Sequence, residues 1–248
     1  MVKLTAHFTH ALFRTGDEDS ERGFDPGMGS LLALLAIPGV FVSLFLFEKY
    51  SSLIRFFRRR LSFDPYLASV PDEYFFIVFA MAITGLVTVM KWNSILPGKR
   101  DFLILSPLPV GAWQIFSANL AAILLAAAVF TVDVNIGSMI LFPMIVTSEI
   151  GKIEDLARFA GIHALSVTLA SAFAFFACLS VMGALMAVLP RRAFEKVSMP
   201  VRVLLIICLI AIFFSSFAPP EILRNAMSHP DALGRWLPSM WYLALYQT

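Results

Sequence analysis

Residues that commonly carry chemistry are few in this chain and form no recognisable catalytic or metal-binding pattern. The motifs HExxH, GxSxG, CxxC and GxxxxGK(S/T) are all absent from the sequence. The histidines and cysteines are His7, His10, His163, His229, Cys178 and Cys208. Both cysteines lie in apolar runs, where we expect buried free thiols, and we interpret His163 as a packed or interfacial histidine. The sequence therefore predicts no catalytic residue, no metal site and no cofactor, and a protein that is not itself an enzyme.

Carboxylates inside a membrane-spanning segment would mark an ion path. Asp133, Glu149, Glu154 and Asp155 are predicted to lie in the connection between the third and fourth spans, where water solvates them. We expect no buried carboxylate pair within the spans, which argues against an ion-coupled pump.

The composition indicates an integral membrane protein. Of 248 residues, 59% are hydrophobic, and the mean hydropathy is +0.81, whereas soluble chains are about 45–50% apolar. Charged residues make up 15%, against about 25% in soluble chains. The net charge of +2 and the lack of a basic stripe with interleaved aromatic residues argue against nucleic acid as a partner.

Charged residues divide the chain into long apolar runs, and a spanning helix needs about 20 apolar residues. The runs are continuous rather than alternating, which favours helices over a barrel. We predict an all-α polytopic membrane bundle of about five transmembrane helices, with six as the alternative. The predicted spans lie near residues 28–47, 74–90, 110–132, 160–188 and 202–218. The run at residues 134–148 is interpreted as a re-entrant or interfacial piece, or as the tail of a long third helix.

Three regions follow from this division. Residues 1–25 are polar and are predicted to be a cytosolic segment, residues 26–220 form the transmembrane domain, and residues 221–248 are an extracytoplasmic or truncated segment. Basic residues do not decide the orientation, because ten would lie inside and nine outside with a cytosolic N-terminus. We favour that orientation because the similar loops LPGKRDF and LPRRAFEK then share the cytoplasmic side.

Two spans carry residues that shape helix packing. Pro38 and Gly39 lie near the middle of the first span, where such a pair is expected to kink a helix. The fourth span is rich in small residues, which let helix backbones approach closely. The candidates for this packing are Gly161, Ala170, Ala174, Ser180, Gly183, Ala184 and Ala187. They could serve a dimer or pore interface, or ordinary packing within the chain.

The break between the second and third spans is the most informative motif. From Lys91 to Val110 it reads KWNSILPGKRDFLILSPLPV. A Pro-Gly pair forms a turn, charged residues then precede an apolar stretch, and two prolines end the piece. We predict a short element at the membrane surface that presents Lys99, Arg100 and Asp101 outward; a plain connecting loop is the alternative.

The stretch from Pro71 to Val110 resembles permease subunits of type-2 ABC exporters. In some bacterial members the second span leads to a tryptophan, and a proline, a basic pair, an Asp-aromatic step and a Leu-Pro pair then precede the third span. The matching residues here are Trp92, Pro97, Lys99, Arg100, Asp101, Phe102, Leu108 and Pro109. The stretch covers about a sixth of the chain. The chain departs from the family in having five predicted spans, where the family has six.

The resemblance implies a half-transporter in the bacterial inner membrane that couples ATP hydrolysis by a separate ABC ATPase subunit to export. It implies a second permease half, identical or different, and contact with membrane lipids. The implied ATPase-coupling element contains Pro97, Lys99, Arg100, Asp101, Phe102 and Leu108. The alternatives are a non-catalytic membrane scaffold or assembly factor, and a membrane-embedded lipid-modifying enzyme.

Overall fold

The computed structural model describes residues 2–13, 26–57, 65–92, 107, 109–148, 153–217 and 237–247. All regular secondary structure in these residues is helical, which confirms the predicted all-α bundle. The helices are α1 (Val2–Phe13), α2 (Pro26–Phe57), α3 (Pro65–Met90), α5 (Ala112–Thr147), α6 (Ile153–Val188), α7 (Arg191–Ser215), α9 (Pro238–Leu243) and the 3₁₀ turn η2 (Ala244–Gln247).

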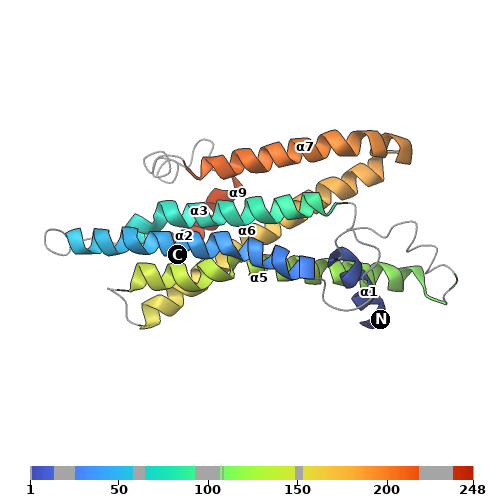
Figure 1. Cartoon of the computed structure of the whole chain (residues 1–248). Helices are drawn as coiled ribbons and strands as arrows, with labels where there is room; N and C mark the ends of the chain where they lie inside the picture. Colours follow the sequence, from blue (N-terminus) through green and yellow to red (C-terminus); the bar gives the residue numbers. More distant parts are fainter. Residues whose placement is uncertain are drawn as a thin grey trace.

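The long helices run up and down the bundle in alternation (Figure 1). The ends of α2, α5 and α7 lie near the starts of α3 and α6, and we call this the α6-start end. The start of α5 and the ends of α3 and α6 lie at the other end, with α1 beside them, and we call this the α1 end. Helix α2 packs along α5, which points the same way, and α3 packs along α6 and, less extensively, along α5 and α7.

Among the described residues, four helices are long and apolar enough to cross a membrane: Tyr66–Met90, Ala112–Thr147, Ile153–Val188 and Arg192–Ser215. The chain is therefore a multi-pass membrane protein. The most apolar stretch of α3 has 72% of its residues buried, against 6% in α7, so α3 is central and α7 is peripheral. Both α5 and α6 have 36 residues, or about 54 Å of helix, which exceeds the roughly 30 Å hydrocarbon layer.

The observed boundaries decide between the interpretations of residues 134–148 and correct the placement of three carboxylates, Asp133, Glu154 and Asp155. Helix α5 is continuous from Ala112 to Thr147, so residues 134–148 are its tail. Asp133 therefore lies inside this helix and not in a connection, and its Oδ2 is buried without a hydrogen-bond partner in the described part of the chain. Glu154 and Asp155 lie in the exposed first turn of α6, and Glu149 falls outside the described residues.

A glycine on each helix brings α2 and α5 into backbone contact. A Cβ atom added to Gly137 would lie 2.6 Å from Cγ2 of Val40 and 2.8 Å from its backbone nitrogen. A Cβ added to Gly39 would lie 3.1 Å from the Val134 carbonyl oxygen. Pro38 lies inside the continuous α2 helix, and the two residues after it, Gly39 and Val40, make the close contact with α5.

Polar side chains also join α5 to α6 inside the bundle. The Asn135 side-chain amide donates to Ser171 Oγ at 3.1 Å and to the Thr131 carbonyl at 2.8 Å. Both Asn135 and Ser171 are buried. Interhelical hydrogen bonds of this kind fix the relative rotation of two apolar helices.

Candidate functional site

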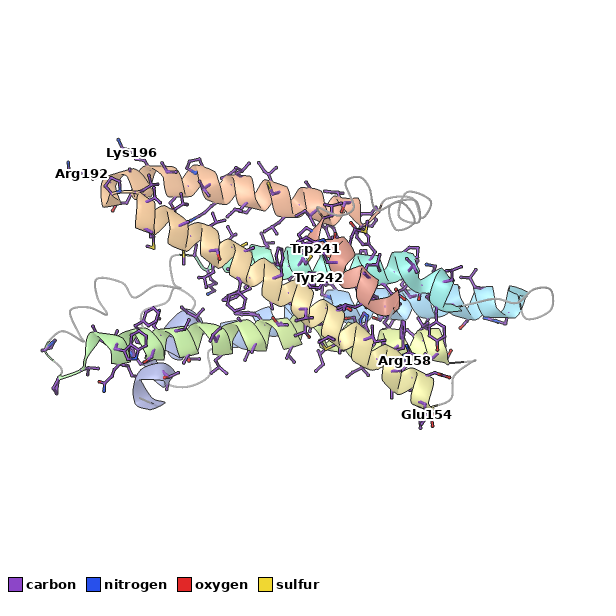
Figure 2. All side chains as sticks on the ribbon, turned by 180° about the vertical axis from the view of Figure 1, so that it is seen from behind. Glu154, Arg158, Arg192, Lys196, Trp241 and Tyr242 are labelled. Carbon is purple, nitrogen blue, oxygen red and sulfur yellow. The ribbon has the colours of Figure 1, made fainter. Side chains whose placement is uncertain are left out.

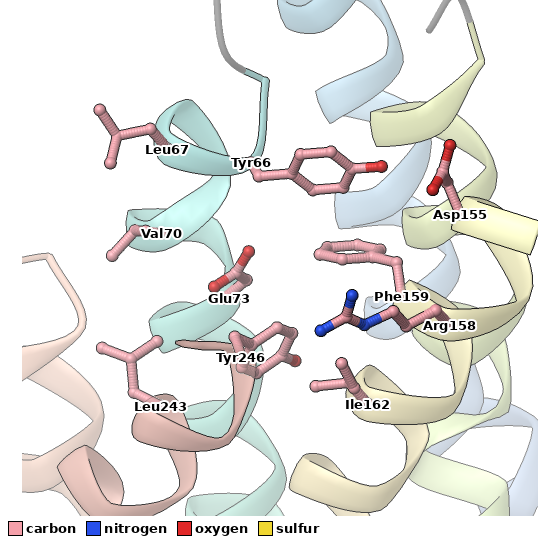
Figure 3. A pocket seen from close by; sticks show the side chains of 10 residues that line it. All are labelled: Tyr66, Leu67, Val70, Glu73, Asp155, Arg158, Phe159, Ile162, Leu243 and Tyr246. Carbon is pink, nitrogen blue, oxygen red and sulfur yellow. The ribbon is translucent and has the colours of Figure 1, made fainter. Parts of the chain in front are cut away.

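A cavity of about 350 Å³ opens at the α6-start end, between α3, α6 and the C-terminal α9–η2 segment (Figure 3). Four apolar, three aromatic and three charged side chains line it. They are Tyr66, Leu67, Val70, Glu73, Asp155, Arg158, Phe159, Ile162, Leu243 and Tyr246. Such a mixture, mostly apolar with a few polar groups that converge, is typical of small-molecule sites.

Glu73 is the most deeply placed charged group of the cavity. Its side chain is 2% exposed, and Ser69, one helical turn earlier on α3, donates a hydrogen bond to its Oε1. In Figure 3 the carboxyl group points into the cavity between Val70 and Tyr246. A buried carboxyl group with a single hydroxyl donor is poorly compensated for the loss of water, which makes it a candidate for ligand binding.

The neighbouring Asp72 points to a different partner. The Lys49 ammonium of α2 lies 2.7 Å from its Oδ2, and the Tyr50 hydroxyl donates to the same oxygen at 2.6 Å. Asp72 therefore ties α3 to α2, while Glu73, the next residue, faces α6 and η2. The two contacts together fix the rotation of α3 about its axis at this end of the bundle.

A buried histidine lies behind the cavity wall. Nδ1 of His163 shares a hydrogen bond of 2.6 Å with the Tyr246 hydroxyl, and its ring lies against Phe76 and Phe142 at centroid distances of 5.6 and 5.0 Å. Its Nε2 has no hydrogen-bond partner among residues 2–247 that the structure describes. Burial raises the pKa of Tyr246 well above its ordinary value, and the nearby Glu73 charge acts in the same direction. The hydroxyl therefore stays neutral and holds the C-terminal η2 turn on α6.

Asp155 and Arg158 line the outer part of the cavity from the first turns of α6. Both side chains are exposed. The Arg158 guanidinium points into the cavity, and the Tyr66 hydroxyl points toward Asp155 (Figure 3). The α3 wall thus carries a deep acidic group, and the α6 wall carries a basic group nearer the opening.

The α9 helix completes the site from the C-terminal side. Trp241 and Tyr242 pack on Phe173 in the middle of α6, with ring centroids 6.3 and 6.2 Å apart (Figure 2). Ser239 donates to the Tyr74 hydroxyl at 3.3 Å. These contacts hold α9 against both α6 and α3, so η2 and Tyr246 close the cavity.

The predicted coupling element lies outside the described residues, at Pro97, Lys99, Arg100, Asp101, Phe102 and Leu108. The structure does describe where it is attached to α3. Trp92 is 3% exposed, and the Arg202 guanidinium of α7 lies 5.4 Å from the centre of its ring. Pro107, near the end of the same segment, is exposed.

The structure divides the small residues predicted on α6 into two groups. Ala170 and Ala174 are buried inside the chain. Gly161, Ser180, Gly183, Ala184 and Ala187 are exposed.

The two thiols differ in burial. Cys178 is buried, while Cys208, which we expected to be buried, is exposed. No set of three possible metal-binding side chains gathers within the described ranges.

Sequence reasoning missed Glu73, Arg158 and Tyr246 as residues of one site. Glu73 directly precedes the charge-free run and lies four residues after Ser69. On a helix this spacing places the carboxyl group and the hydroxyl group on the same face, and it was the signal that could have indicated their contact. The other two residues come from distant parts of the chain, and only the packing of η2 brings them near.

No protein-family model, no curated protein and no solved structure matches this chain.

Proposed function

We propose that the chain is the membrane-spanning permease subunit of an ABC exporter in the bacterial inner membrane, working with a separate ATPase. The observation that carries the proposal is the Lys91–Val110 segment, which resembles the coupling element of type-2 exporters and continues directly from α3. Because α3 is the most buried of the four apolar helices, a force on this segment acts on the centre of the bundle.

The attachment of the segment favours transmission of motion over local bending. Trp92 is buried and stacks on Arg202 of α7, and the backbone nitrogen of Lys91 still donates to the Val87 carbonyl at 2.9 Å. A shift at this point therefore moves the end of α3 as a unit, along with the α7 contact. Small displacements of packed helices are a common way to change the access of a transport path.

A second permease half has a suitable surface on α7 and on the second half of α6. The apolar stretch of α7 is almost entirely unburied within this chain. The exposed small residues Ser180, Gly183, Ala184 and Ala187 lie on the neighbouring α6. Close approach of another helix is easiest at such positions, so an identical or a related subunit could pack there.

Charge reversal tests the coupling. Lys99→Glu with Arg100→Glu should lower both the retention of the ATPase in mild detergent and the stimulated ATP hydrolysis, because the docking charges are inverted. Arg192→Glu with Lys196→Glu is a matched control, since these residues are exposed at the α1 end but lie outside the segment (Figure 2). Unchanged retention and unchanged hydrolysis in the Lys99 and Arg100 double variant would refute the docking role.

One observation favours a second candidate, a membrane-embedded lipid-modifying enzyme. Glu73, His163 and Tyr246 gather at one level of the bundle beside a cavity, and such a gathering of polar groups is what a catalytic site requires. An enzyme of this kind would turn over lipid in vesicles without any ATPase, and Glu73→Gln would abolish the turnover. A chain that neither retains an ATPase nor modifies lipid would leave the scaffold role.

A further inference from the structure

We propose that the cavity between α3, α6 and η2 binds a zwitterionic group, with its ammonium at Glu73 and its phosphate or carboxylate at Arg158. The two walls that carry these residues face each other across the opening (Figure 3). The inference concerns ligand binding alone and holds whether or not the chain is a transporter.

Glu73 provides the recognition of the positive group. Ser69 donates one hydrogen bond to its Oε1, although an ionised carboxylate can accept about four. Tyr66, Phe159 and Tyr246 also line the cavity, and aromatic rings attract cations. An ammonium group of a ligand would compensate the buried carboxylate and contact these rings at the same time.

Arg158 provides the recognition of the negative group. A guanidinium has five N–H donors, so contacts of Arg158 within the protein still leave donors that can bind phosphate or carboxylate in a bidentate manner. A purely anionic ligand would leave the buried Glu73 carboxyl group without a cationic partner and would meet repulsion from Asp155, and a purely cationic ligand would meet repulsion from Arg158. Only a ligand with both charges matches both walls.

The cavity is also suited to the apolar part of an amphiphile. Leu67, Val70 and Leu243 line the side opposite Arg158, and Leu67 is 58% exposed at the outer surface. The cavity volume of about 350 Å³ is what roughly a dozen water molecules occupy in the liquid. It is enough for a group the size of phosphoethanolamine. The first turns of α6 lie at the end of a helix longer than the hydrocarbon layer, where lipid headgroups are found.

Two sources could supply this chemistry, namely the headgroup of a phospholipid or a free zwitterion in the aqueous phase. The test uses the purified full chain in detergent and measures the affinity for four probes. They are phosphatidylethanolamine, phosphatidylglycerol, O-phosphoethanolamine and glycerol 3-phosphate. Phosphatidylglycerol is the anionic counterpart of phosphatidylethanolamine, and glycerol 3-phosphate is that of O-phosphoethanolamine. A zwitterionic probe that binds should bind at least tenfold more tightly than its anionic counterpart.

Substitutions identify the residues responsible. Glu73→Gln and Arg158→Gln should each weaken binding by about tenfold or more, because each removes a charge-assisted hydrogen bond. Glu154→Gln and Arg192→Gln are matched controls, since both residues are exposed and neither lines the cavity. Val70→Phe should also abolish binding, because it fills the cavity and leaves its charges unchanged.

The outcomes separate clearly. Binding of O-phosphoethanolamine alone indicates a soluble ligand, and binding of phosphatidylethanolamine alone indicates a lipid. The proposal is wrong if the anionic probes bind as tightly as the zwitterionic ones, if no probe binds, or if Glu73→Gln binds like the wild type. Retention of an ATPase is measured without any probe, so failure of the export proposal is recognised independently.

Discussion

Replacing Gly137 by alanine tests whether direct backbone contact between α2 and α5 stabilises the bundle. The added Cβ would lie 2.6 Å from Cγ2 of Val40 and 2.8 Å from its backbone nitrogen. Ordinary contacts of this kind are about 3.5–4.0 Å, so the helices must separate by roughly an ångström or distort. A side chain can rotate away, but the backbone nitrogen of Val40 cannot.

The expected loss follows from this geometry. Overpacking of a well-packed interior costs about 1–3 kcal/mol, and for chains of this size about 1 kcal/mol changes the melting temperature by about 2–4 °C. Gly137→Ala should therefore lower the melting temperature by between about 2 and about 12 °C. Thermal unfolding of the purified chain in mild detergent, followed by circular dichroism, measures this change.

Three other glycines provide a graded series of controls. At Gly39 the nearest atom is the Val134 carbonyl oxygen at 3.1 Å, so an alanine there should cost less than at Gly137. At Gly161 and Gly183 nothing lies within 4 Å, and alanine should stabilise α6 by up to about 1 kcal/mol through helix propensity. If Gly137→Ala melts no lower than Gly161→Ala, the close approach of the two helices is refuted.

The same unfolding assay tests three polar contacts. Asn135→Leu removes the interhelical hydrogen bond to Ser171 and should cost about 0.6–1.7 kcal/mol of stability. If the stability losses of Asn135→Leu and Ser171→Ala add fully in the double variant, the contact is contradicted. Lys49→Met should cost less than about 1 kcal/mol, because its side chain is 41% exposed in the ion pair with Asp72; a larger loss would show that this ion pair is effectively buried. Tyr246→Phe leaves Nδ1 of His163 without its hydrogen bond and should cost about 1–3 kcal/mol of stability. An unchanged melting temperature would argue that η2 does not close the cavity.

The helical fold could be predicted because its physical cause is local. Long runs without charge must form helices in a bilayer, since backbone groups find no water there. The boundaries were less predictable, because the helices extend past the hydrocarbon layer. Helix α3 begins at Pro65, nine residues before the charge-free run at Tyr74, and α5 continues through Asp133.

The candidate site could not be predicted from local pattern. Glu73, Arg158 and Tyr246 come from three elements that are distant in the sequence, and they meet only because α9 packs on α6 and turns the chain back toward α3. The prediction of solvated carboxylates rested on sequence neighbours alone. In the folded chain, Asp133 lies inside α5 with its Oδ2 buried, and a count of charges along the sequence does not reveal this burial.

A single helix connects the two regions for which we propose functions. Glu73 lies in the third turn of α3, and Trp92 follows its last turn at the other end, about 28 Å away along the helix. Asp72 holds the first end to α2 and Trp92 holds the second to α7, so α3 transmits a displacement from one end to the other.

A shift of α3 imposed at Lys91–Val110 would change the separation between Glu73 and Arg158. Linkage then requires that a zwitterion in the cavity and an ATPase at the segment alter each other's affinity by the same factor. We expect phosphatidylethanolamine to change ATPase retention in the wild type and to have no such effect in Glu73→Gln. An equal effect in both proteins would show that the two ends act separately.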